Sequence, residues 1–265
     1  MYSRLQLAKK YIYYFFTAAN GKGHGTHSPF VYKFITDILN DSKKYPEYET
    51  IEHLRKKLLQ EKTSIEVQDY GAGSRTISTK NRFVNDIAGS SLKPRKFAQL
   101  LFRMVRYFES KNILELGTSL GITTCYLASA IKKSKVITLE GSPSIAAIAG
   151  KNFQKVNLGN IELIEGNFDN TIHSALSIID SVDLAFVDGN HTKKATLNYF
   201  SALLKKCDEK SIFVFDDIHW SEEMEQAWDQ IKNNVDVTLT IDLFFIGIVF
   251  FNKDFKVKQH FTIRF

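Results

Sequence analysis

A short apolar segment that runs directly into a glycine-containing turn sets the strongest limit on how this chain can fold. Residues 113–116 read Ile-Leu-Glu-Leu, and the next five residues read Gly-Thr-Ser-Leu-Gly. A helical segment is expected from 122 to about 132. A buried strand, a glycine turn and a helix in this order build a nucleotide-shaped crevice at the carboxyl edge of an open α/β sheet.

Short apolar runs alternate with helical segments after residue 112, which indicates parallel βαβ units. The expected strands are 113–116, 136–139, 161–165, 184–187 and 212–215. A helix at 222–232 ends this pattern. Residues 237–241 and 247–251 have no helix between them and predict an antiparallel hairpin, followed by a turn and a final strand near 257–263. We therefore predict an α/β fold with a doubly wound, mostly parallel seven-stranded sheet and an antiparallel C-terminal hairpin.

The first part of the chain has a different character. Apolar spacing predicts helices at 1–19, 30–39 and 48–60, and an amphipathic helix at 97–108 leads into the sheet. Ser28 and Pro29 form a helix start, with a capping hydroxyl before a proline. We therefore expect a mainly helical N-terminal cap on the substrate side over residues 1–95, and a ligand-binding domain over residues 96–265.

The acidic residue at the end of the first sheet strand narrows the choice of ligand. A carboxylate at Glu115 would repel a pyrophosphate but would attract a ligand that carries an ammonium group. S-adenosylmethionine has an adenosine end, an amino-acid end and a positive sulfonium between them. It fits this turn better than NAD does.

The composition of the chain limits the classes of protein to which it can belong. The longest apolar run, residues 243–251, is far below the roughly 20 residues that span a bilayer, so neither a transmembrane segment nor a secretory signal is expected. The net charge is +6, and it is read as spread over separate lysine pairs on solvated faces. Two cysteines, Cys125 and Cys207, cannot form a metal cluster alone, and a reduced cytoplasmic setting is the default expectation.

Five short motifs follow one another in the order found in a known family. They are Glu-Leu-Gly-Thr-Ser-Leu-Gly at 115–121, Leu-Glu at 139–140, Glu-Gly-Asn at 165–167, Val-Asp-Gly-Asn-His at 187–191 and Phe-Asp-Asp at 215–217. Over residues 95–252 the chain resembles class I S-adenosylmethionine-dependent methyltransferases, specifically the catechol and caffeoyl-CoA O-methyltransferase type. The resemblance implies their Rossmann-like sheet and transfer of a methyl group to an oxygen of a small or medium hydroxylated acceptor.

The resemblance also implies a set of cofactor-binding residues at the ends of the first four sheet strands. Gly117 lacks a Cβ and lets the turn approach the methionine part. Thr118, Ser119 and the Gly121 amide offer donors to its carboxylate. Glu140 can accept both ribose hydroxyls, unless it is simply an exposed strand-end carboxylate. The complete predicted set is Glu115, Gly117, Thr118, Ser119, Gly121, Glu140, Gly166, Asn167, Phe168 and Asp188.

Asn167 and Asp188 each have a second interpretation as well. Gly166, Asn167 and Phe168 follow the third strand, where the adenine is expected. Asn167 could bond the edge of the base or could form an ordinary asparagine turn. Asp188 follows the fourth strand and is also expected to take part in catalysis.

A divalent cation, Mg²⁺ or a similar ion, is expected where the fourth and fifth strands end. Asp188, Asp216 and Asp217 would repel one another without a cation, and hard cations prefer carboxylate oxygens. In the resembling enzymes the metal holds the acceptor hydroxyl and lowers its pKa. Those enzymes usually have Asp-Asn at the fifth strand and a lysine at the position of His191. The histidine could act as a general base or as a metal ligand. The alternative is that Asp216 and Asp217 only cap the following loop.

Other motifs lie outside this scheme. The Asp-Tyr-Gly-Ala-Gly-Ser sequence at 69–74, with Gly71 and Gly73, matches the loose cofactor pattern but is interpreted as a substrate-side loop or a structural turn. His24 and His27 belong to a His-Gly-Thr-His-Ser-Pro-Phe segment that resembles one in an uncharacterised bacterial methyltransferase-like group. That segment could form a lid, or its histidines could make only local hydrogen bonds.

The sequence is also compatible with three other functions. The chain lacks the proline-containing loop of base-amino methyltransferases and a cysteine after the fourth strand, which disfavours nucleic acid but leaves RNA ribose methylation open. A non-catalytic module that binds S-adenosylmethionine is the second alternative. The third is attachment to a membrane surface, because residues 11–16 are aromatic and follow Lys9 and Lys10, although packing onto the rest of the protein is favoured. A homodimer is also left open.

Overall fold

The computed structural model describes residues 1–67 and 81–265, so the glycine motif at 69–74 lies outside the described residues. The chain forms two compact units. Residues 42–179 form the central unit, and residues 1–41 together with 180–265 form the terminal unit. The expected boundary at residue 95 coincides with neither limit, because residues 42–95 group with the first half of the sheet motifs and residues 1–41 group with the C-terminal strands.

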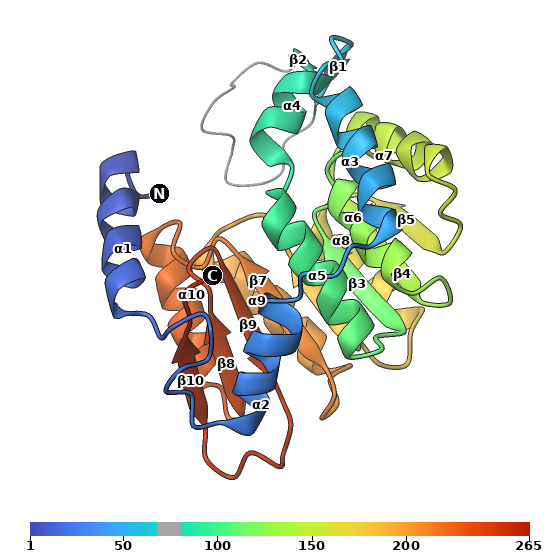
Figure 1. The fold of residues 1–265 in the computed structure, drawn as a ribbon. Helices are drawn as coiled ribbons and strands as arrows, with labels where there is room; N and C mark the ends of the chain where they lie inside the picture. Colours follow the sequence, from blue (N-terminus) through green and yellow to red (C-terminus); the bar gives the residue numbers. More distant parts are fainter. Residues whose placement is uncertain (68–80) are drawn as a thin grey trace. The chain divides into compact units, whose positions relative to one another are not determined.

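The central unit is built on three parallel strands (Figure 1). β3 (Asn112–Leu116) pairs with β4 (Lys135–Glu140), which pairs with β5 (Ile161–Glu165). The register places Glu115 of β3 opposite Thr138 of β4. The helices of this unit are α3 (Pro46–Leu58), α4 (Val84–Ser91), α5 (Arg95–Tyr107), α6 (Ile122–Ala130), α7 (Pro143–Lys155) and α8 (Phe168–Ser177). A separate small antiparallel pair consists of β1 (Ser64–Glu66) and β2 (Asn81–Phe83).

The terminal unit contains the remaining strands in the order β6, β7, β9, β8, β10. β6 (Leu184–Val187) and β7 (Ile212–Asp216) run parallel, whereas β9 (Ile246–Phe250) is antiparallel to both β7 and β8 (Leu239–Asp242). β10 (Gln259–Thr262) is parallel to β8. The helices of this unit are α1 (Arg4–Thr17), α2 (Pro29–Lys33), α9 (Lys193–Leu204) and α10 (Glu222–Asn233), with the π-helix η1 (Phe34–Leu39) continuing directly from α2.

The first helix packs beside the C-terminal residues, as Figure 1 shows for the terminal unit. Tyr14 is buried, and its hydroxyl donates to the carbonyl of Ile263 at 2.5 Å. The backbones of Ala19 and Ile263 form a parallel bridge. Tyr11 and Tyr14 also contact the ring of Phe244, with centroids 5.1 and 5.2 Å apart. These contacts explain why the N-terminal segment joins the C-terminal strands.

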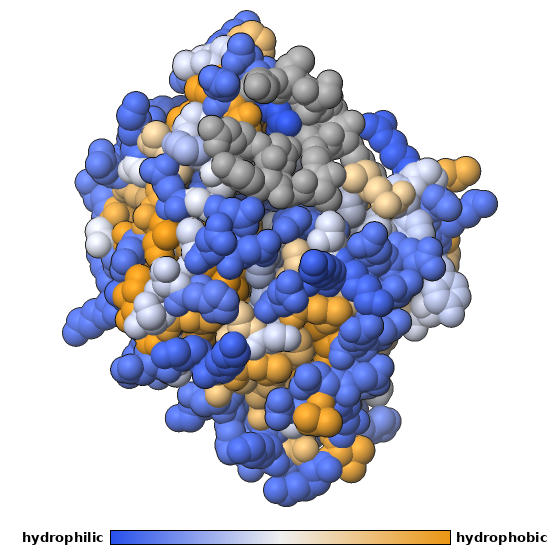
Figure 2. All heavy atoms as spheres, turned by 180° about the vertical axis from the view of Figure 1, so that it is seen from behind, coloured by the Kyte–Doolittle hydropathy of each residue, from blue (hydrophilic) through white to orange (hydrophobic). Residues whose placement is uncertain are grey.

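Burial follows the pattern that the sequence predicts for a parallel α/β core. β6, β7 and β9 are buried at every residue, and so is α6. The face in Figure 2 is mostly hydrophilic, with hydrophobic groups in scattered patches. Among the described residues, no helix combines the length and the apolar character needed to cross a membrane.

The α/β fold class and the antiparallel C-terminal hairpin are confirmed. The strand count differs, because the strands β3 to β5 of one unit and β6 to β10 of the other number eight rather than seven. The additional strand is β10, which lies in the predicted range 257–263. The helix expected at 30–39 is an α-helix only to Lys33 and then widens to the π-helix η1.

Candidate functional site

The glycine turn after β3 has the backbone shape that its sequence predicts. Gly117 and Gly121 have φ values of 108° and 83°, in the region that favours glycine. A Cβ on Gly121 would lie 2.5 Å from a ring carbon of Phe153, so this position also requires a residue without a side chain. The amide of Gly121, predicted to serve the ligand, donates to the Thr118 carbonyl at 2.9 Å and closes the turn. The importance of Gly121 is therefore steric in this structure.

Glu115 is buried at the base of this turn. One carboxylate oxygen accepts hydrogen bonds from the hydroxyls of Thr124 in α6, at 2.5 Å, and Thr138 in β4, at 2.6 Å. The Thr118 hydroxyl lies 2.6 Å from that of Thr138. A short polar network therefore holds the carboxylate in a fixed place next to the turn.

Glu140 lies at the end of β4 and is also buried, which argues against an exposed strand-end carboxylate. Its two oxygens accept separate backbone N–H groups, those of Ser119 at 2.8 Å and Ser142 at 2.9 Å. The Ser119 hydroxyl lies 2.7 Å from that of Ser91 in α4. Glu140 is thus oriented by the glycine turn itself, so the two predicted cofactor carboxylates belong to one connected arrangement in the central unit.

The segment after β5 has a structural role. Gly166 has a φ of 132°, and its amide donates to the Glu140 carbonyl at 2.9 Å. The side-chain oxygen of Asn167 accepts the N–H of Asp169 at 2.9 Å and caps α8, which begins at Phe168. The capping turn, the alternative given for Asn167, is the arrangement in the structure. A contact of residues 166–168 with adenine stays a prediction.

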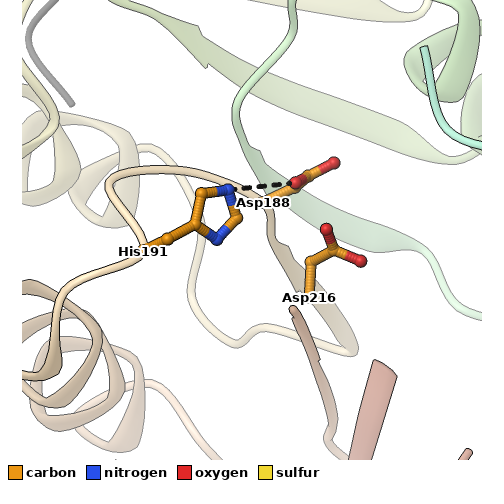
Figure 3. A group of neighbouring side chains, drawn as sticks. All are labelled: Asp188, His191 and Asp216. Carbon is orange, nitrogen blue, oxygen red and sulfur yellow. Dashed lines mark ion pairs between the residues drawn. The ribbon is translucent and has the colours of Figure 1, made fainter. Parts of the chain in front are cut away.

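A cluster of two carboxylates and one imidazole lies in the terminal unit. Asp188 follows β6, His191 lies in the next loop, and Asp216 is the last residue of β7. Figure 3 shows their side chains converging, and one ligand atom from each lies within 4.8 Å of the others. The Nε2 atom of His191 lies 3.7 Å from an Asp188 oxygen. Asp216 is almost fully buried, whereas Asp188 and His191 are partly exposed.

The composition of this cluster differs from the predicted metal set. Asp217 is not a member, and His191 takes its place. Asp217 has a positive φ of 54°, which turns it away from the direction of Asp216, and its carboxylate lies 4.0 Å from the other ring nitrogen of His191. Its carbonyl accepts the N–H of Trp220 at 2.9 Å, so its backbone shapes the loop. Carboxylate oxygens and one imidazole nitrogen suit a divalent ion such as Mg²⁺ or Mn²⁺, so the donor set fits a cation.

A second histidine arrangement was not predicted. The ring of His219 lies between two acids, with Nδ1 2.9 Å from Glu225 and Nε2 2.8 Å from Asp242. Burial alone would lower the pKa of His219, but the hydrogen bonds and charges of Asp242 and Glu225 outweigh burial and raise the pKa. Glu225 also accepts hydrogen bonds from Tyr2 and Lys10 at the chain's beginning. In the sequence this histidine stands next to a tryptophan, at 219–220, shortly after the end of β7.

The remaining predicted features lie apart from these groups. His24 and His27 are exposed in the segment between α1 and α2, and the lid function stays a prediction. Cys125 is fully buried, and burial raises the pKa of its thiol, as expected for an inert core cysteine. Trp220 is partly buried, and its carbonyl accepts the N–H of Tyr2 at 3.0 Å.

Comparisons with known proteins show similarity to methyltransferases. Residues 114–218 match a family model described as a methyltransferase domain. A catechol O-methyltransferase of Niastella koreensis is 31% identical over 133 residues, which cover 46% of this chain and 55% of that protein. The chain therefore spans about half the length of this curated relative.

Solved structures share the fold at low identity. An O-methyltransferase of Bacillus cereus in complex with SAH has a TM-score of 0.56 at 19% identity and covers 83% of this chain and 97% of its own. The SAH-bound Podospora anserina methyltransferase PaMTH1 has a TM-score of 0.58 at 13% identity, with 96% and 98% covered. Over residues 114–218 the chain is therefore similar to methyltransferase domains, and the resemblance to class I S-adenosylmethionine-dependent methyltransferases of the catechol and caffeoyl-CoA O-methyltransferase type is confirmed.

Proposed function

We propose that this protein transfers the methyl group of S-adenosylmethionine to a hydroxyl oxygen of a small or medium acceptor, with the help of a divalent cation. The observation that carries the proposal is the convergence of Asp188, His191 and Asp216 at the carboxyl ends of β6 and β7. Such a donor set supplies what a hydroxyl acceptor needs, namely a place for a cation that binds oxygen.

Residues of the central unit would bind and orient S-adenosylmethionine. Glu115 provides a fixed negative charge for the ammonium group of the methionine part, held in place by Thr124 and Thr138. Glu140 is the acceptor for the ribose hydroxyls, oriented by two backbone N–H groups. Preorganised polar groups of this kind reduce the reorganisation that ligand binding requires.

On the acceptor side, Asp188, Asp216 and Nε2 of His191 would hold the cation. When bound, the cation lowers the pKa of a coordinated hydroxyl and so makes its oxygen a better nucleophile. Asp217 faces Nδ1 of the same ring and would fix the ring's orientation, as outer carboxylates commonly do for metal-binding histidines. Because the Niastella koreensis relative is a catechol O-methyltransferase, acceptors with two adjacent hydroxyls are the first to test.

Two measurements test the binding of S-adenosylmethionine and the need for a divalent cation separately. Calorimetry with S-adenosylmethionine and its demethylated product should show binding that Glu140→Gln weakens by about tenfold or more, since a hydrogen bond to a charged group contributes about 1.5–3 kcal/mol. Methyl transfer to hydroxylated acceptors should then require Mg²⁺ or Mn²⁺ and should be lost in Asp188→Asn.

The exposed acid Asp236 offers a matched control, and Asp236→Asn should behave as the wild type. Cofactor binding without transfer to any acceptor would favour the non-catalytic module. Transfer that is unchanged by Asp188→Asn and by chelation of the metal would refute the assigned cation site.

A further inference from the structure

The first helix carries two different apolar faces. Leu7, Tyr11 and Tyr14 are four and three residues apart, so they share the face that packs around Phe244. Leu5, Ile12 and Phe16 are seven and four residues apart and share the opposite face. The face with Tyr11 and Tyr14, called the inner face, packs onto the rest of the protein as expected. The face with Leu5, Ile12 and Phe16, called the outer face, is not needed for this packing.

The outer face of α1 is strongly exposed. Leu5, Ile12 and Phe16 are 67%, 55% and 78% exposed, and Tyr13 beside them is 72% exposed. Single exposed apolar residues are common on protein surfaces, but a continuous stripe along a helix at the outside of its unit is typical of an interaction surface (Figure 1).

The charge of this part of the chain indicates what the stripe binds. Residues 1–36 contain five basic residues and no acidic one, so they contribute +5 of the net +6 of the whole chain. The basic residues elsewhere are almost balanced by acids, so the excess charge lies mainly in residues 1–36 and not, as expected, in the separate lysine pairs along the chain. Lys9 lies within the outer stripe and Arg4 flanks it, and both are exposed.

We propose that the outer face of α1 binds an anionic lipid surface, with the helix lying in the plane of the membrane interface. Exposed Leu, Ile, Phe and Tyr side chains would enter the boundary between headgroups and acyl chains, while Arg4 and Lys9 contact the anionic headgroups. With 14 residues, α1 is too short to cross a bilayer, which requires about 20.

A second copy of the chain fits this face less well. A symmetric contact between two outer faces would bring the Lys9 ammonium groups of both copies into one apolar interface, and no acidic residue of α1 could compensate them. An anionic surface, in contrast, complements both the apolar stripe and its charge. The inner face would stay bound to the protein, so the helix would not have to detach.

The experiment measures sedimentation of the full-length protein with vesicles of phosphatidylcholine alone and of phosphatidylcholine mixed with anionic phosphatidylglycerol, without cofactor or acceptor. Binding is expected only to the anionic vesicles, and it should weaken as salt is raised. Ile12→Ser combined with Phe16→Ser should reduce the partition coefficient at least tenfold. Arg4→Gln with Lys9→Gln should reduce it by about thirtyfold, because each basic residue near such a surface contributes about fivefold.

Val235→Ser provides the matched control, because Val235 is 88% exposed but lies far along the chain in the loop after α10. This variant should bind as the wild type, and unchanged thermal unfolding of all variants shows that they are folded. Failure of the wild type to bind anionic vesicles at low salt would overturn the proposal, as would unchanged binding of the Ile12/Phe16 variant. A wild-type dimer in analytical ultracentrifugation that the same variant dissociates would assign the face to a second copy instead.

Discussion

Two histidines of the terminal unit lie between pairs of acids, and they differ in how close those acids are. His191 and His219 have nearly equal side-chain exposure, 24% and 23%. The acids nearest to His191 lie at 3.7 and 4.0 Å, beyond hydrogen-bonding distance, whereas those of His219 lie at 2.9 and 2.8 Å. The two histidines are therefore distinguished by the distances from their ring nitrogens to the carboxylate oxygens, and not by their exposure to solvent.

This difference separates a structural histidine from a candidate ligand. Both ring nitrogens of His219 are hydrogen-bonded to acids, so the ring joins the loop after β7 to α10 and β8 and has no nitrogen left for a cation. The ring of His191 faces two carboxylates at distances that leave room for an ion to draw the groups together.

The largest effect is expected from Asp216→Asn. Loss of this buried carboxylate removes one charge from the candidate cation site, and methyl transfer should fall by about a hundredfold or more, since a cation that polarises the acceptor oxygen contributes several kcal/mol. Magnesium titration of the initial rate and calorimetry with Mg²⁺ measure the effect. His219→Gln should leave Mg²⁺ affinity nearly unchanged, and a comparable loss in both variants would remove the distinction.

His219→Gln should instead destabilise the fold, by about 2 kcal/mol at pH 6, because hydrogen bonds between charged groups are lost. The pKa of His219 is raised in the folded protein. Its contribution is therefore complete below the ordinary value of about 6.5 and disappears as the pH rises through the raised pKa. Urea unfolding between pH 6 and pH 9 should show a shrinking gap between the wild type and the variant, and a constant gap would contradict the assignment.

For His191→Gln we expect the reverse pattern. The free energy of unfolding should change by less than about 0.5 kcal/mol, because the ring makes no contact with an acid at hydrogen-bonding distance. Affinity for the divalent ion should fall by about tenfold, within the range found when groups that support a metal site are removed. A marked loss of stability without a change in metal affinity would make His191 a second structural histidine.

The smallest effect is expected from Tyr2→Phe. The Tyr2 hydroxyl donates to the partly exposed carboxylate of Glu225 at 2.7 Å, and solvent weakens such a bond to roughly 0.5–1.5 kcal/mol. Burial raises the pKa of Glu225, but the hydrogen bonds of Tyr2, Lys10 and His219 outweigh it and lower the pKa. The contribution of Glu225 is therefore present above its ordinary pKa and is lost as the pH falls through the lowered value. Acid unfolding of Tyr2→Phe should begin at a higher pH than that of the wild type, and coincident acid transitions would show that Tyr2 has no part in the network.

Much of the fold could be predicted because its signals are local. The apolar runs at 161–165 and 184–187 coincide with β5 and β6, and the other predicted strands differ from β3, β4 and β7 by a residue or two at the ends. The pairing of β10 with β8 could not be predicted, since a short strand of four residues carries no signal for its neighbour or its direction. The units could not be predicted either, because the contact of Tyr14 with Ile263 joins residues almost 250 positions apart.

The candidate site also has a part that could be predicted from local sequence motifs and a part that could not. Glu115, Gly117, Gly121 and Glu140 belong to short motifs whose spacing fixes their place at strand ends, and the structure brings them together. The cation cluster could be predicted only in part, because the sequence placed three carboxylates at these strand ends but did not show that His191, and not Asp217, completes the group with Asp188 and Asp216. The His219 network was missed because its partners come from three segments of the sequence, residues 2–10, 225 and 242.

The bridge between Ala19 and Ile263 has a consequence for synthesis of the chain. A ribosome makes the helix α1 long before it makes the strand β10 and the Ile263 carbonyl that hold this helix. Residues 42–179 lie between them and form a unit of their own, so they can collapse while translation continues. The aromatic N-terminal helix can therefore complete its contacts only after the central unit has been made and residues 259–263 have been added.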